Sequence, residues 1–134
     1  GFSRVMLLTR DPASNSMKAR VALGVDAEQH VKKGFSVPLG GGRDIFQAAL
    51  TQGVDISIDD IDAPKIRAHV PDWYRKAVPA KSVMLFPIVL NKKAVALLYG
   101  DADTAGALAF GAEELSLLKT LRNQVVLAIR TQNV

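Results

Sequence analysis

The residues best suited to chemistry lie together in one ten-residue segment, Arg67 to Lys76, which reads RAHVPDWYRK. This segment contains the only tryptophan of the chain, Trp73, together with Tyr74 and His69. Indole and phenol rings can close over a planar ligand, and each offers one N–H or O–H group to orient it. Basic neighbours can attract a phosphate or a carboxylate. The segment is therefore the first candidate for a binding site.

The competing interpretation of Trp73 is structural, because a single tryptophan in a long loop usually buries area and anchors the loop. The nearby basic side chains Lys65, Arg67 and Arg75 are by default part of a solvated surface. His69 has no obvious second ligand, so the sequence does not indicate a metal or haem site. The anchoring and binding interpretations both stay open at this point.

Other polar or glycine-rich segments have simpler explanations than a site. The glycine triplet at residues 40–42 fits neither common phosphate-binding glycine pattern and is interpreted as a flexible turn. The acidic residues at 59, 60 and 62 lack the spacing and the remaining ligands of a calcium loop. No nucleophile–base motif is present, so we expect no enzymatic activity, no cofactor and no bound metal. The candidate ligand-binding residues are Phe46, Asp59, Arg67, His69, Trp73, Tyr74 and Ser82.

The composition is that of one globular domain. The 134 residues suffice for a single core, with 49% hydrophobic and 22% charged residues. Seventeen Lys and Arg against thirteen Asp and Glu give a net charge of +4, spread along the chain, which does not favour a nucleic-acid partner. The absence of cysteine excludes disulfides, thiolate catalysis, Cys-ligated zinc and thioether-attached chromophores.

The sequence also bears on location and on the extent of the chain. No apolar run reaches the roughly 18 residues of a bilayer span, and the N-terminus lacks the pattern of a signal peptide. We therefore expect a cytoplasmic domain without a membrane partner. The chain begins at Gly1 rather than Met, and an apolar strand pattern starts at Val5. We expect residues 1–134 to be a single domain from a longer multidomain protein.

The first forty residues predict strands and one short helix. Residues 3–9 form an apolar run typical of a strand covered on both faces. Residues 11–16 supply turn formers, and residues 17–23 then alternate, which places Met17, Ala19, Val21 and Leu23 on one face of a strand. Residues 26–33 allow a short helix, and residues 35–39 are predicted to be extended, with a proline that withholds a ladder donor.

The middle of the chain predicts one helix, one strand and a central hairpin. Asp44 is placed to cap a helix that Gly53 ends. Residues 54–58 alternate as a strand, and a long irregular region begins at Asp59. Residues 82–90 and 94–100 are two apolar segments joined by a polar turn, typical of neighbouring central strands. These elements predict an α+β fold with about six mostly antiparallel strands flanked by helices.

The longest predicted helix covers residues 112–131, where apolar residues recur at helical spacing. Its apolar stripe is wider than contact with one sheet requires, because Leu117 and Val126 extend it. We therefore expect Leu117, Leu121 and Val126 to contact the same helix of a second copy, which would make the protein a homodimer.

The order of these elements resembles a GAF domain over nearly the whole chain. The segments that carry the resemblance are FSVPLGGG followed by a helix, VDISIDD after Gly53, SVMLFPI, AVALLYG, and FGAEELSLLKTLRNQVVLAIR. A PAS-like or profilin-like sheet is the alternative. The late apolar hairpin followed by a long terminal helix favours the GAF arrangement.

The resemblance implies a sensory or dimerising regulatory module. In such a module the terminal helices cover one face of the sheet, and a ligand pocket lies on the other, beneath residues 59–79. Similar domains have a helix before the first strand, and we expect residues 1–134 to lack it. The stretch from Asp59 to Pro79 is similar to GAF domains attached to HDOD regulatory domains in bacterial signalling proteins. GAF-like free methionine sulfoxide reductases use cysteine, which this chain lacks.

Two functional hypotheses follow. In the first, the domain is a non-enzymatic sensor that binds an unidentified small molecule between the sheet and residues 59–80, and relays binding through the C-terminal helix to an attached signalling domain. In the second, the pocket is filled by the domain's own side chains, and the domain serves to pair protomers or to bind another protein.

Overall fold

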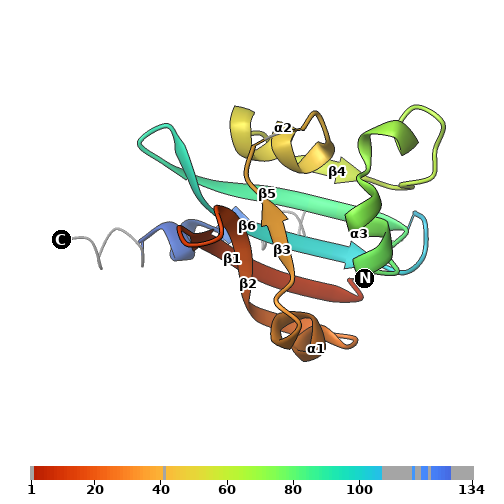
Figure 1. Ribbon diagram of the computed structural model, residues 1–134, viewed down its shortest axis with the longest axis horizontal. Helices are drawn as coiled ribbons and strands as arrows, with labels where there is room; N and C mark the ends of the chain where they lie inside the picture. The colour runs from red at the N-terminus through yellow and green to blue at the C-terminus, as the bar shows by residue number, and fades with distance from the viewer. Residues whose placement is uncertain (1, 41, 107–115, 117–118, 121, 128–134) are drawn as a thin grey trace.

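The chain folds around one six-stranded antiparallel sheet, which a computed structural model describes for residues 2–40, 42–106, 116, 119–120 and 122–127 (Figure 1). The sheet order is β3-β2-β1-β6-β5-β4, so the first and the last strand of the chain order form the central pair. The strands are β1 (Arg4–Asp11), β2 (Ser16–Gly24), β3 (Ser36–Pro38), β4 (Ile56–Ile58), β5 (Ser82–Leu90) and β6 (Lys93–Ala102). This arrangement confirms the predicted α+β fold.

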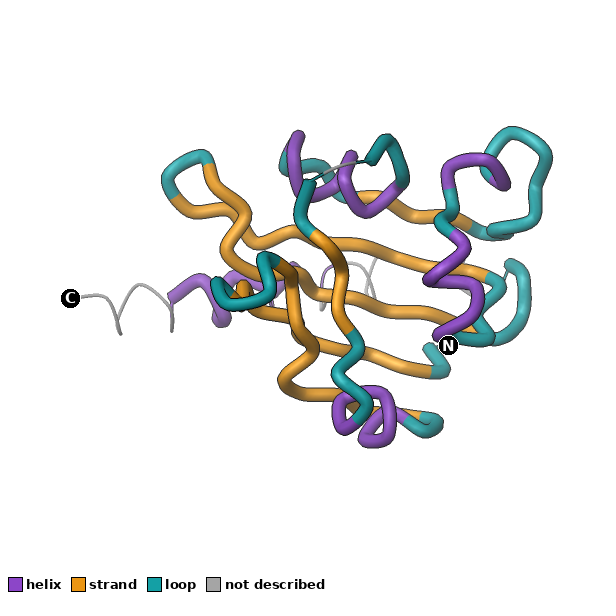
Figure 2. Tube along the Cα trace, viewed as in Figure 1, coloured by secondary structure: helices purple, strands orange, loops and turns teal. Residues whose placement is uncertain are grey.

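Short helices connect the strands. They are α1 (Ala27–Lys32), α2 (Ile45–Gln52), the 3-10 turn η1 (Arg67–His69) and α3 (Asp72–Ala77). Figure 2 shows α2 near one long edge of the sheet, α1 near the other, and the residue 59–80 segment with α3 at one end of the strands. The segment predicted to be irregular thus contains two helical turns, and Trp73 lies on the second of them.

The sequence sets the limits of α2 as predicted. The Asp44 side chain accepts a hydrogen bond from the Gln47 amide at 2.9 Å, which satisfies one of the unpaired donors of the first helical turn. Gly53 ends the helix with a φ of 66°, in the left-handed region that glycine adopts without strain. A Cβ atom at Gly53 would also lie 3.3 Å from a Val89 methyl.

One register prediction is wrong. Met17 and Ala19 are buried, but Val21 and Leu23 are 57% and 71% exposed. Leu7 pairs with Val21 and Leu8 with Ala19, so β2 carries one extra residue at that point. Because side chains alternate with a period of two, a bulge of one residue turns every later side chain to the opposite face. A pattern read from one strand does not reveal such a bulge.

The two faces of the sheet carry separate apolar clusters. On the inner face, residues of β1, β5 and β6 pack against α2, α3 and the segment before β3, forming the main core. On the outer face, Met84, Phe86, Leu98 and Ala102 form a smaller cluster. The Phe2 ring lies against Gly100 on this face, where a Cβ atom would come within 2.3 Å of it. The candidate ligand site therefore belongs to the inner face.

Part of the predicted C-terminal helix lies within the described residues. Residues 116, 119–120 and 122–127 are helical. Arg122 lies over the Phe86 ring at 5.4 Å and pairs with Asp55 at 2.6 Å, which ties the helix to the outer face and to β4. Val126 is half-buried, whereas Leu117 and Leu121 lie outside the described residues. The predicted dimer contact of these three residues stays a prediction.

Candidate functional site

Five aromatic rings meet on the inner face and form what we call the central cluster: Phe35, Phe46, Trp73, Tyr74 and Tyr99. They come from the residue before β3, from α2, from α3 and from β6. Neighbouring ring centroids are 5.1–6.3 Å apart and most pairs are steeply inclined, the geometry in which aromatic pairs attract. Phe46, Tyr74 and Tyr99 are fully buried, while Trp73 is partly exposed.

A chain of hydrogen bonds starts from this cluster. The Tyr74 and Tyr99 hydroxyl oxygens are 2.6 Å apart, and the Tyr99 hydroxyl donates to Oδ2 of Asp101. Because Tyr99 uses its proton on Asp101, Tyr74 is the donor to Tyr99. Arg4 donates from Nε to the same Oδ2 at 3.0 Å, and its Nη2 bonds to Asp103. These hydrogen bonds link α3, β6 and β1 through polar groups that are buried except at Asp103.

The topology brings this network together. Arg4 begins β1 and Asp101 lies near the end of β6, 97 residues later, and the antiparallel register places them directly opposite each other. Tyr99 lies two residues before Asp101, so both side chains point to the same face. Arg4 is 1% exposed and Asp101 is fully buried, which makes this an ion pair inside the core rather than on the surface.

One oxygen of the network lacks a partner. Oδ1 of Asp101 is buried and accepts no hydrogen bond within the described part of the chain. Burial raises the pKa of Asp101 above its ordinary value, against the opposing effect of its bonds to Arg4 and Tyr99. Burial, followed by the charge of Arg4, lowers the pKa of the nearby His30. A donor group placed beside Oδ1 would relieve the cost of leaving this acceptor unpaired.

The two tyrosines provide a direct test of this geometry. They are the only tyrosines in the chain, and burial is the main cause that raises the pKa of both hydroxyls. We expect the folded protein to show no tyrosinate absorbance at about pH 11, although a free phenol ionises near about pH 10. The pKa of both hydroxyls is higher in the folded protein than in the unfolded chain. The free energy of unfolding is therefore fully retained below about pH 10 and decreases as the pH rises above it. An ultraviolet titration with and without urea checks this, and gradual ionisation without unfolding would contradict it.

The candidate residues fall into three places. Phe46, Trp73 and Tyr74 come together in the central cluster. Ser82 is fully buried at the start of β5 and donates to the Thr104 carbonyl oxygen at 3.1 Å, away from the rings. Asp59, Arg67 and His69 are exposed. The structure thus unites three of the seven candidates, and none of these placements tests whether they bind a ligand.

Sequence reasoning missed Arg4, Tyr99 and Asp101. Each lies in or beside a strand predicted to be apolar, where a charged residue needs a partner if it is buried. The charges within these apolar stretches were the available signal. The pairing of Arg4 with Asp101 across 97 residues could not be predicted, because it depends on which strands are neighbours.

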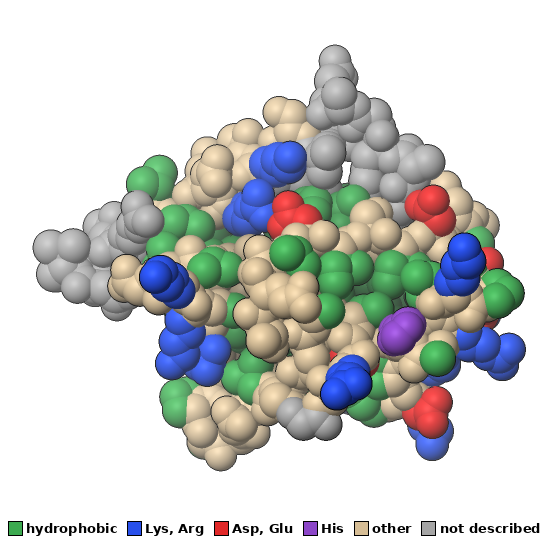
Figure 3. Space-filling model, turned by 90° about the horizontal axis from the view of Figure 1, so that it is seen from above, with side chains coloured by type: hydrophobic (Ala, Val, Ile, Leu, Met, Phe, Trp, Pro, Cys, Tyr) green, Lys and Arg blue, Asp and Glu red, His purple; other side chains and the backbone are tan. Residues whose placement is uncertain are grey.

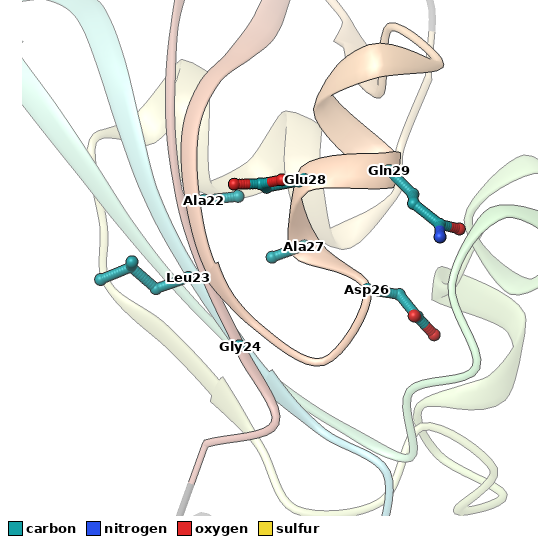
Figure 4. A pocket seen from close by; sticks show the side chains of 7 residues that line it. All are labelled: Ala22, Leu23, Gly24, Asp26, Ala27, Glu28 and Gln29. Atoms are coloured by element: carbon teal, nitrogen blue, oxygen red, sulfur yellow. The ribbon is translucent and has the colours of Figure 1, made fainter.

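Three surface grooves are lined by described residues outside the central cluster. One of about 370 Å³ lies between β2 and α1, lined by residues 22–24 and 26–29. Figure 4 shows Ala27 and Glu28 pointing from α1 toward β2, whereas Asp26 and Gln29 point away from that strand. Two further grooves of about 410 Å³ flank α2. None of these three is lined by Trp73 or Tyr74.

Within the described residues there is no group of three or more His, Asp or Glu that could hold a metal ion. The same residues contain no helix long and apolar enough to cross a bilayer.

The sheet order, the helices on its inner face and the terminal helix on its outer face define a GAF-domain fold. Comparison with solved structures agrees. A methyl-accepting chemotaxis protein fragment, residues 122 to 287, matches with a TM-score of 0.77 and 23% identity, over 99% of this chain and 80% of that chain. The GAF domain of a two-component sensor histidine kinase from Bacillus halodurans matches with a TM-score of 0.69 and 17% identity, over 99% of this chain and 84% of that one.

The chain therefore has the fold of a GAF domain, as the sequence predicted. A type II free methionine-R-sulfoxide reductase from Thermoplasma acidophilum is also similar in structure, with a TM-score of 0.64 and 17% identity over 97% of this chain and 80% of that chain. Proteins that share this fold thus include an enzyme as well as regulatory domains. No family model and no curated protein matches this sequence.

Proposed function

We propose that this chain is a non-enzymatic sensory domain of a signalling protein. Its fold matches that of a domain from a sensor histidine kinase and of a segment from a chemotaxis protein. The chain has no cysteine and contains no recognisable nucleophile–base motif, which supports a regulatory rather than a catalytic role. The attached domain, for which an HDOD domain is the sequence-based candidate, would receive the signal.

The ligand site we propose is the central cluster beneath α3. The observation that carries the proposal is the unpaired Oδ1 of Asp101, a fully buried acceptor beside the hydroxyl chain of Tyr99 and Tyr74. A ligand with an N–H or O–H donor would satisfy this oxygen, and its apolar part would contact the rings. Trp73 is the partly exposed ring of the cluster and lies on a helix of six residues. Moving Trp73 aside would therefore disrupt fewer contacts than moving one of the fully buried rings.

The hydrogen-bond chain offers a route from this site to the C-terminal helix. Arg4 joins Asp101 to Asp103, and the Asp103 amide donates to the Ser3 hydroxyl at 3.0 Å. Ser82 holds the next residue, Thr104, through its carbonyl oxygen. A ligand that alters the Asp101 bonds would thereby bias the segment that leads into the helix, which is how binding to one conformation becomes a signal.

The test is a thermal-shift screen with small amines, amides, nucleosides and amino acids, run on the wild type and on Asp101→Leu. A ligand present at about one hundred times its dissociation constant should stabilise the wild type by about 2.7 kcal/mol. The Asp101→Leu variant should lose this stabilisation, whereas the exposed Asp26→Asn control should keep it. The sole tryptophan reports binding independently, since its emission should change when a ligand reaches the cluster. Stabilisation that survives in Asp101→Leu would place the ligand elsewhere.

A second candidate function is a ligand-free pairing module. The contacts among the five rings favour it, because they already fill space that a ligand would need. This proposal requires a homodimer held by the C-terminal helix. Sedimentation of the wild type and of Leu117→Glu separates the two functions, since a monomeric wild type rejects the pairing module and leaves the sensor intact.

A further inference from the structure

A second site lies outside the central cluster, in a groove of about 410 Å³ that we call the β4 groove. Its walls are the exposed edge of β4, one side of α2, and the segment from residue 66 to residue 69. Its apolar lining consists of Ile45, Ala48, Ile56, Ile58 and Ile66. Figure 3 looks onto this side of the molecule and shows a strip of hydrophobic side chains bordered by charged ones. The volume is within the roughly 300–1,000 Å³ of known ligand pockets.

The charges at the rim of the β4 groove are not equally available. The Asp44 carboxylate accepts a bond from the Gln47 amide, and Asp55 is held by Arg122 at 2.6 Å. Arg43 and His69, the remaining charged or titratable lining residues, make no side-chain hydrogen bond or ion pair within the described residues. The Arg43 guanidinium and the His69 imidazole are therefore uncommitted, whereas both carboxylates already have donors.

An aliphatic floor with an uncommitted guanidinium and an uncommitted imidazole at its rim matches one chemical class. We propose that the β4 groove binds a small apolar carboxylate, with its hydrocarbon part along the isoleucines and its carboxylate near Arg43 and His69. A guanidinium forms strong charge-assisted hydrogen bonds with a carboxylate, and apolar burial adds about 0.8 kcal/mol per CH₂ group. A multiply charged phosphate fits less well, because it would leave the isoleucine floor uncovered. An added peptide strand fits less well too, since β4 offers an edge of three residues.

Occupation of the β4 groove would also affect the C-terminal helix. Asp55 both lines the groove and holds Arg122, which lies over Phe86 on the outer face. A ligand in the groove would therefore lie beside the contact that ties this helix to β4. The proposal is independent of the central cluster, because none of its residues is an aromatic member of that cluster or part of the Asp101 network.

The probe is decanoate, with decylammonium as the matched cation of equal chain length, both below the concentration at which they form micelles. Titration followed by amide NMR should show saturable shifts at Ile56–Ile58 and Ile45 with decanoate, and weaker binding of decylammonium. Arg43→Glu combined with His69→Glu should weaken decanoate binding at least about tenfold, the effect of losing a charge-assisted bond. A control with the same charge change, Lys65→Glu combined with Lys76→Gln, should bind as the wild type does, because neither lysine lines the groove.

Three results would overturn the proposal. They are equal affinity for decanoate and decylammonium, equal weakening by the control pair, and absence of saturable shifts at β4 in a folded protein. Ala48→Trp provides a second test, since it fills the groove without changing charge, and circular dichroism verifies that it folds. Asp101→Leu should still bind decanoate, so failure of the sensor proposal and failure of this one give different results.

Discussion

Replacing Arg4 by methionine is expected to lower the free energy of unfolding by about 3–5 kcal/mol, the usual cost of removing one partner from a buried ion pair. The variant leaves the Asp101 carboxylate fully buried with Tyr99 as its remaining donor among the described residues. Urea unfolding measures the loss. Asp101→Asn should cost less, because Arg4 would keep its bonds to Asp103 and to the Val25 carbonyl.

The pH dependence of the Arg4→Met variant follows from the direction of the Asp101 shift. Burial already raises the pKa of this carboxyl, and loss of Arg4 raises it further. The folded variant therefore binds a proton more readily than the unfolded chain, so its stability falls as the pH rises through the folded pKa. The deficit should be larger at about pH 7 than at about pH 5. A deficit that does not vary over this range would show that Asp101 is not the group left unpaired.

A paired substitution separates charge from packing. Exchanging a buried ion pair for apolar residues of similar volume is often neutral or stabilising. Arg4→Met combined with Asp101→Leu should therefore recover most of the stability that Arg4→Met alone removes. If the double variant is as unstable as the single one, the contribution of Arg4 is its packing rather than its pairing with Asp101.

Replacing Phe46 by alanine is expected to cost about 3–5 kcal/mol, because it removes a large ring from a filled core. Phe46 is fully buried, and its ring centroid is 5.1 Å from those of both Trp73 and Tyr74. Loss of this neighbour should also shift the emission of Trp73 to longer wavelength. Urea unfolding followed by fluorescence measures both effects.

The matched control for Phe46→Ala is Leu23→Ala. Leu23 is 71% exposed, so its truncation should change stability by no more than about 0.5 kcal/mol. If the two variants lose equal amounts of unfolding free energy, the central cluster is not the core that holds α2 and α3 on the sheet.

The local elements could be predicted because their signals are local. Asp44 and Gly53 mark the ends of α2 through bonds and dihedral angles that involve a few neighbouring residues. The apolar segments of β5 and β6 indicate central strands, and the sheet places both there. Within the candidate site, the sequence indicated Trp73 and Tyr74 by their rarity, and they do meet Phe46 in the central cluster.

The sequence by itself determined the α+β class, the limits of α2 and the exclusion of cysteine chemistry, because these depend on composition and on short-range spacing. Only the tertiary structure decided that Arg4 meets Asp101 and that Oδ1 of this carboxylate lacks a donor within the described residues. Those facts depend on strand neighbours far apart in sequence. Likewise, the bulge that exposes Val21 and Leu23 arises from pairing between β1 and β2, and pairing is a property of two strands at once.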